Sequence, residues 1–204
     1  MKKQLNGYLP DALAREAKLR HATHYLSVLK TAQESILKSG DKARKGYQLF
    51  HREWPNIKMA LNRVRKNSIE GKKPAELFNS YMVAVAELLP LHYFPRDCRN
   101  LLEMGLKVSQ RLGKKDVEVL HHLNLGTFFM SQKKYDVAEN HLDQAQKLAT
   151  DLKDVSTEGR VFNEMARLCL DTKRTEKAIN ILLKKIKLCA VDEEIRAMRL
   201  GLAY

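Results

Sequence analysis

Small and hydrophobic residues in the C-terminal two thirds of the chain recur at a fixed interval of 40 residues. A shift by that interval superimposes five columns of similar residues: Cys98, Ala138 and Ala178; Leu102, Leu142 and Leu182; Val108, Leu148 and Leu188; Ala86, Gly126 and Ala166; Leu89, Phe129 and Cys169. Residues three or four positions apart share one face of an α-helix, so the columns predict apolar helix faces. A fixed period indicates an array in which each unit buries its apolar face against the next.

One unit carries the most informative cluster of the chain. Its members have the spacing of a tetratricopeptide-type helical hairpin: Leu125-Gly126, Tyr135, Ala138 and Ala145. The polar turn Gln132–Lys134 separates the two helices, and small side chains let antiparallel helices approach to about 8–10 Å. Tetratricopeptide units usually have about 34 residues, whereas armadillo and HEAT units have about 40–47. The order of the residues favours the former, with lengthened helices or connections.

The period divides the chain into a repeat domain and a preceding segment. Repeats are expected at 79–118, 119–158 and 159–193, with a partial unit at 194–204, in a domain 76–204 that follows a basic helical segment 1–75. We therefore predict an all-α fold of antiparallel hairpins stacked as a right-handed tetratricopeptide-type solenoid, preceded by a small helical bundle. The residues expected to shape it are Gly126, Tyr135, Ala138, Ala145, Ala166, Ala178 and Trp54.

Both ends of the array are expected to be irregular. Pro90 and Pro95 flank the turn of the first copy, so its first helix should end before Pro90. The apolar stretch Leu200–Tyr204 repeats the Leu-Gly-x-x-aromatic pattern without a partner helix. We interpret it as part of a longer protein or as a surface that another subunit covers, and we favour the longer protein.

The first third of the chain predicts three helical stretches. An amphipathic helix should follow Pro10 and end at Ser39–Asp41, because Gly40 tolerates the left-handed conformation of a helix C-terminus. A short helix is expected at 42–51. Pro55 should begin the next one, since its missing N–H would be unpaired there, and Trp54 should pack back against that helix.

The net charge of +13 is concentrated in this first third. Residues 1–75 carry 17 basic against 6 acidic side chains, whereas residues 76–204 carry 20 against 18. Such an excess is typical of a nucleic-acid or acidic-lipid surface, and also of a solvated face or one that meets an acidic domain. Aromatic residues for base stacking are few, so nucleic-acid binding through residues 1–75 is the alternative rather than the leading hypothesis.

Composition and motifs exclude several classes of protein. No apolar run has the roughly 18–20 residues of a membrane span, and no hydrophobic stretch follows Met1–Asn6 as in a signal peptide. Three scattered cysteines, Cys98, Cys169 and Cys189, favour a reducing cytoplasm, and two of them fall on core columns. We therefore expect a cytoplasmic protein without membrane association.

The motifs of catalysis and metal binding are also missing. His21 and His24 are one helical turn apart, but no further ligand completes a metal set. His121 and His122 are adjacent and do not face each other on a helix, so one should pack and the other should be exposed. We expect neither an enzyme nor a metal or other cofactor.

A solenoid of this kind presents a concave surface formed by the first helix of each repeat. Eight polar residues are expected to face into it: Glu87, Asn124, Thr127, Ser131, Arg160, Asn163, Glu164 and Arg167. Asn124 and Asn163 are candidates to clamp a peptide backbone, and Arg160 with Arg167 to pair with a carboxylate or phosphate. The alternative, that all eight are solvated polar positions, stays open.

Three stretches of the first third, together with the repeats, carry a family resemblance: Arg20–Leu26, Gly46–Phe50 and Glu53–Ile57. The chain resembles the region that joins the winged-helix part to the tetratricopeptide array in bacterial NB-ARC-type STAND signalling ATPases. The resemblance implies a sensor arm whose repeats bind a trigger and release an ATPase domain of the parent protein for signalling. No Gly-x-x-x-x-Gly-Lys-Ser/Thr loop is present, so ATPase activity is not carried over. We therefore expect a non-catalytic scaffold for protein–protein or ligand interaction.

Overall fold

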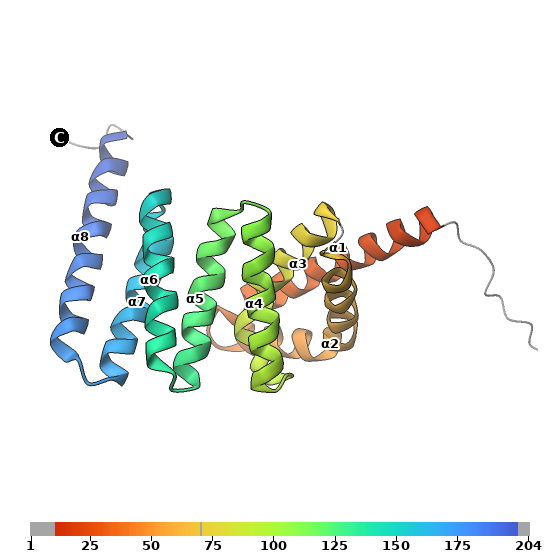
Figure 1. Cartoon of the computed structure of the whole chain (residues 1–204), viewed down its shortest axis with the longest axis horizontal. Coiled ribbons are helices and arrows are strands. Elements are labelled where there is room, and N and C mark those ends of the chain that lie inside the picture. Colours follow the sequence, from red (N-terminus) through yellow and green to blue (C-terminus); the bar gives the residue numbers. More distant parts are fainter. Residues whose placement is uncertain (1–10, 70, 200–204) are drawn as a thin grey trace, which may run out of the picture. The chain divides into compact units, whose positions relative to one another are not determined.

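The computed structural model describes residues 11–69 and 71–199, and regular structure throughout these ranges is helical. Among these residues, no helix is long and apolar enough to cross a membrane. The chain forms two compact units, Met1–Val85 and Ala86–Tyr204 (Figure 1). The apolar end Leu200–Tyr204 lies outside the described residues.

The first unit consists of three packed helices: α1 (Asp11–Ile36), α2 (Asp41–Asn67) and α3 (Lys72–Val85). The first helix ends at Ile36, before the expected Ser39–Asp41. Gly40 lies directly ahead of α2 with a φ of 65° and a ψ of −138°, so it does not adopt the left-handed helical conformation expected of a helix C-terminus. Burial of Leu26 and Leu29 on α1 and of Phe78 on α3 forms the core. The Tyr81 hydroxyl donates a hydrogen bond of 2.7 Å to the carbonyl of Ala22, which ties α3 to α1.

The boundary between the units falls after Val85, later than the expected boundary at residue 75. The reason is that α3 packs against both α1 and α2. Its residues Tyr81, Met82 and Val85 are fully buried. The helix expected to open the first repeat therefore belongs to the first unit.

The interruption expected at Pro55 is wrong, because α2 is one continuous helix with Pro55 inside it. Its buried residues continue at three- and four-residue spacing across the proline: Gly46, Phe50, Trp54, Ile57, Ala60, Leu61 and Val64. Pro55 itself is exposed. Interior proline costs about 3 kcal/mol, and each large apolar side chain buried on this stripe returns about 1.5–3 kcal/mol. Trp54 is buried within the same helix, with its ring centroid 5.2 Å from that of Phe50 one turn earlier, and there is no separate helix for it to pack back against.

The second unit is a row of helices, each packed against its neighbour in sequence (Figure 1). Its elements are η1 (Ala86–Leu91), α4 (Pro95–Arg111), α5 (Lys115–Ser131), α6 (Tyr135–Leu152), α7 (Val155–Asp171) and α8 (Thr175–Arg199). In addition, α5 contacts α7. The α-helical conformation ends at Val85, ahead of Pro90 as expected, but a 3-10 helix continues through the proline. Pro95 begins α4, where no intrahelical partner for an N–H is needed.

The four turns between these α-helices share one geometry. A residue with positive φ stands at Gly113, Lys133, Lys153 and Lys173, an interval of 20 residues each time. The N–H of the residue after each positive-φ position always bonds the carbonyl five residues before it, as from Lys134 to Phe129 at 2.9 Å. This pair of features is the Schellman motif, which satisfies carbonyls at the helix C-terminus. One helix and one turn therefore occupy 20 residues, in agreement with the 40-residue period of the sequence.

Small residues on the repeat columns mark the helix contacts. Ala138, Ala145, Ala166 and Ala178 are buried, and Tyr135 is half-buried at the start of α6. At Gly126 a Cβ atom would lie 2.7 Å from Cδ2 of Leu142, so any larger residue would force the Leu142 side chain to move at this close approach of α5 and α6. Leu102 and Leu142 are buried on their column, whereas Leu182 is 37 % exposed on α8.

Candidate functional site

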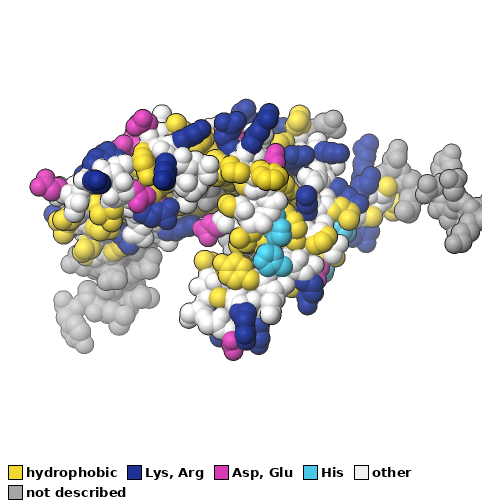
Figure 2. All heavy atoms as spheres, turned by 90° about the horizontal axis from the view of Figure 1, so that it is seen from below, with side chains coloured by type: hydrophobic (Ala, Val, Ile, Leu, Met, Phe, Trp, Pro, Cys, Tyr) yellow, Lys and Arg dark blue, Asp and Glu magenta, His cyan; other side chains and the backbone are white. Residues whose placement is uncertain are grey.

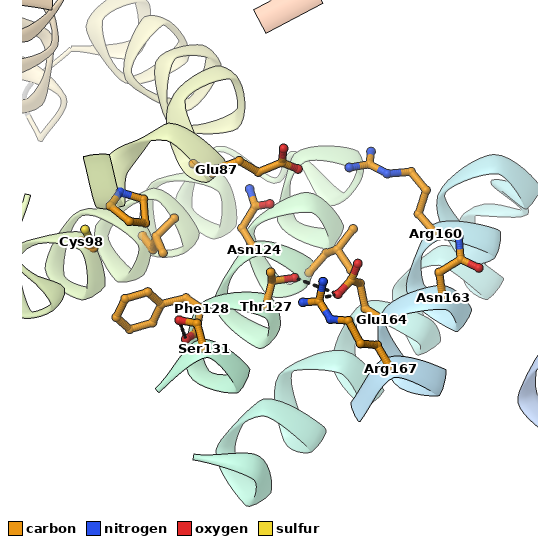
Figure 3. A pocket seen from close by; sticks show the side chains of 14 residues that line it. Glu87, Cys98, Asn124, Thr127, Phe128, Ser131, Arg160, Asn163, Glu164 and Arg167 are labelled. Carbon is orange, nitrogen blue, oxygen red and sulfur yellow. Dashed lines mark hydrogen bonds and ion pairs between the residues drawn. The ribbon is translucent and has the colours of Figure 1, made fainter. Parts of the chain in front are cut away.

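A groove in the second unit brings together all eight polar residues that the repeat pattern places on its inner face (Figure 3). Its volume is about 480 Å³, and η1, α4, α5 and α7 contribute to its lining. The eight residues come from three of these elements: Glu87 from η1; Asn124, Thr127 and Ser131 from α5; Arg160, Asn163, Glu164 and Arg167 from α7. Their convergence on one groove is observed, and their role in binding stays a prediction.

Apolar residues complete the groove, and the sequence did not identify them as part of it. They are Ala86, Pro90, Cys98, Leu102, Leu123 and Phe128. Several of them lie on the repeat columns, which mark helix contacts. A repeat position shows only that its side chain packs between helices. It does not show whether that side chain also borders a cavity. Phe128 is half-buried, so part of its ring remains accessible. The groove therefore combines apolar contact area with polar groups.

The α7 wall of the groove follows from helix geometry. Positions 160, 163, 164 and 167 are three or four apart and share one face. Arg167 pairs with Glu164 at 2.7 Å, and the hydroxyl of Thr127 on α5 approaches the same carboxylate at 3.5 Å. Arg167 is therefore engaged within the protein. Arg160 is exposed and has no ion pair within the described part of the chain, so Arg160 is the better placed to meet an anionic group.

The two amide side chains differ in what they offer. The Asn163 Oδ1 atom accepts a hydrogen bond of 2.9 Å from Nζ of Lys185 on α8, which leaves its NH₂ group to donate. Asn124 is half-buried and points into the groove (Figure 3). Both the donor and the acceptor of Asn124 can serve a peptide group. Glu87 on η1 and Arg160 on α7 extend toward each other from opposite sides of the groove (Figure 3).

Three histidines of the second unit, His121, His122 and His141, form a packed cluster. His121 and His122 are both buried, so the expectation that one of them is exposed is wrong. Nδ1 of His122 lies 3.1 Å from Nδ1 of His141 on α6, and the His141 ring stacks on Phe129 with centroids 5.6 Å apart. His121 fills the space beside Gly105 of α4. Among the described residues, no three His, Cys, Asp or Glu side chains are grouped to hold a metal ion.

Burial controls the protonation of this cluster. It lowers the pKa of His121 to about 4, and the neighbouring charge of His122 acts in the same direction. The pKa of His122 is also lowered to about 4, chiefly by burial and then by His141, against an opposing effect of Glu118. The pKa of His141 is lowered by burial and raised by Glu103. The cluster is therefore neutral near pH 7.

No protein-family model, curated protein or solved structure matches the chain. Inferences about function therefore rest on the geometry of the groove and on the residues that line it. The NB-ARC resemblance stays a prediction.

Proposed function

We propose that this chain is a non-catalytic interaction module whose groove binds an extended peptide segment of a partner protein. The observation that carries the proposal is the convergence of the eight polar residues on one groove with apolar lining. Helices far apart in sequence supply these residues at repeat-related positions.

The chemistry of the groove suits a peptide. Asn124 and the free NH₂ of Asn163 can pair with backbone carbonyl and N–H groups, which every peptide presents. Leu102, Leu123 and Phe128 offer apolar area for one side chain of the ligand. Binding sites commonly combine apolar lining with a few polar groups that fix orientation. Arg160 then favours an acidic side chain or a C-terminal carboxylate on the ligand.

The proposal includes a right-handed tetratricopeptide-type solenoid for the second unit. The 20-residue recurrence of the Schellman turns and the close approach of α5 and α6 at Gly126 support it. In such an array the first helices of successive repeats line one surface. The eight polar residues of the groove lie on η1, α5 and α7, which alternate with α4, α6 and α8.

The proposed context is the sensor arm of a STAND-type regulator in the cytoplasm. Its partners would be a trigger protein or peptide and an NB-ARC-type ATPase domain in the parent protein. Support comes from the sequence stretches around Arg20–Leu26 and Glu53–Ile57. The unpaired state of all three cysteines, of which Cys98 and Cys169 are buried, is consistent with a reducing compartment.

A displayed library of random peptides tests the proposal with the full chain as bait. An enriched peptide, made synthetically, should bind the double variant Asn124→Ala/Asn163→Ala about tenfold or more weakly, since two hydrogen bonds are lost. Asn140→Ala is the matched control, because Asn140 is exposed on α6 and does not line the groove. Lack of any enriched peptide, or equal affinity for wild type and double variant, would refute the proposal.

A further inference from the structure

The first unit contains a second cavity, of about 360 Å³, with a basic lining. We name it the basic pocket and define it by the residues around it: Arg15, Lys18 and Leu19 of α1; Arg63, Val64 and Asn67 of α2; Gly71 and Pro74 at the start of α3. Leu19 and Val64 supply apolar area. Among the described residues that line it, none is acidic.

The three cations of the basic pocket converge from two helices. Arg15 and Lys18 are three residues apart and share a face of α1, while Arg63 comes from α2. Within the described residues, none of the three has an ion-pair partner. Lys and Arg side chains are frequent toward the N-terminal end of the face in Figure 2.

Three other arginines of the same two helices are paired with carboxylates. Arg20 pairs with Glu16 at 2.9 Å on α1, and Arg44 pairs with Asp41 at 2.9 Å on α2. Arg52 is also paired, with Glu53 at 3.0 Å. The charges of these three arginines are thus offset locally, whereas in the described part of the chain no carboxylate forms an ion pair with Arg15, Lys18 or Arg63.

Two further features make this cavity electropositive. Arg63 is half-buried, and its charge contributes, after burial itself, to the lowered pKa of His21. The first turn of α3 also carries no acidic residue. The first N–H groups of a helix have no intrahelical partner and attract anions, and Gly71 and Pro74 place this helix start at the cavity.

We propose that the basic pocket binds the phosphate group of a small phosphorylated ligand. Three converging cations suit a multiply charged oxyanion, because each can donate charge-assisted hydrogen bonds to a separate oxygen. The apolar area of Leu19 and Val64 can contact the uncharged part of the ligand. The volume of the cavity lies within the roughly 300–1,000 Å³ of small-molecule sites. A cavity of this volume favours a small ligand over the extended backbone of a nucleic acid.

Calorimetry with inorganic tripolyphosphate and the full chain at low ionic strength tests this assignment. Saturable binding of one tripolyphosphate per chain is expected. Arg63→Gln and Lys18→Gln should each weaken it about tenfold or more, since each removes a charge-assisted contact. Arg20→Gln is the control, because it removes one positive charge from α1 outside the pocket and should leave the affinity within about twofold. Lys18 is exposed, so its replacement keeps the test valid even if Arg63→Gln perturbs folding.

Two additional measurements separate the possible outcomes. The pKa of His21, followed by NMR, should rise when tripolyphosphate offsets the charge of Arg63. Competition by single-stranded RNA identifies a nucleic-acid surface: tight RNA binding that increases with length and depends equally on Arg20 would overturn the proposal. Absence of saturable binding, or equal weakening by all three substitutions, would also overturn it. None of these outcomes depends on peptide binding in the groove of the second unit.

Discussion

Acidification should destabilise the second unit through its buried histidines. The pKa values of His121 and His122 are about 4 in the folded chain, against 6.5 for ordinary histidine. Between these values the unfolded chain binds more protons than the folded one. Stability is therefore complete above about pH 6.5 and decreases as the pH falls toward 4.

The magnitude follows from the same values. At pH 5, each histidine contributes about 2 kcal/mol of destabilisation, because the ordinary pKa lies about 1.5 units higher and one unit corresponds to about 1.4 kcal/mol. The two rings are adjacent and interact, so their sum of about 4 kcal/mol is an upper bound. The contact between Nδ1 of His122 and Nδ1 of His141 is one cause of the lowered pKa of His122. Only one of these nitrogens can carry the proton of a hydrogen bond, and full protonation places a proton on both.

Urea unfolding followed by circular dichroism at pH 7 and pH 5 measures this loss. His122→Gln removes one of the titrating rings, so its stability should decrease by about 2 kcal/mol less than that of wild type between the two pH values. His24→Gln is the control, because His24 is exposed on α1. Moderate salt in all samples screens the repulsion caused by the net charge. An equal pH dependence in wild type and His122→Gln would show that this ring does not titrate as the buried geometry requires.

Two further predictions concern the backbone of the repeats. Gly126→Leu should lower the free energy of unfolding by about 1–3 kcal/mol or more, because even a Cβ atom meets Leu142 at 2.7 Å; an unchanged melting temperature would mean that the α5–α6 contact is misplaced. Lys133→Gly should raise the free energy of unfolding by about 0.5–1 kcal/mol, since Lys133 has a φ of 56° that glycine adopts without strain. Lys134→Gly, at a φ of −92°, should give no such gain, and equal effects of the two glycines in denaturant titrations would contradict this explanation.

The 40-residue period of the sequence correctly predicted the features that depend on local contacts repeated from unit to unit. Columns such as Cys98, Ala138 and Ala178 are buried, and the turn at Lys133 lies where the polar residues placed it. The inner face of α7 also follows from helical spacing alone. These features need only the 3.6-residue helical period and its repetition, which a single sequence contains.

The features that were not predicted depend on contacts between distant segments. Pro55 is a strong local signal for a helix start, but burial of Trp54 and its neighbours on the same stripe keeps α2 continuous. His122 contacts His141 on the next helix. The prediction that either His121 or His122 is exposed considered only these two neighbours in sequence, and it was therefore wrong. The sequence shows that residues 1–75 are rich in basic side chains. It does not show that Arg15 and Lys18 lie beside Arg63, because this depends on how α1 and α2 pack.

The equal spacing of the positive-φ residues has a consequence for how the array can change in length. Removal of residues 114–153 would join Gly113 directly to Asp154, and both sides of the junction would keep their role in a Schellman turn. The helices that follow would retain their direction and the face that they present. Removal of a single 20-residue segment would instead reverse the direction of every later helix. The hairpin is therefore the smallest segment of this array that can be gained or lost without reversing the helices that follow it.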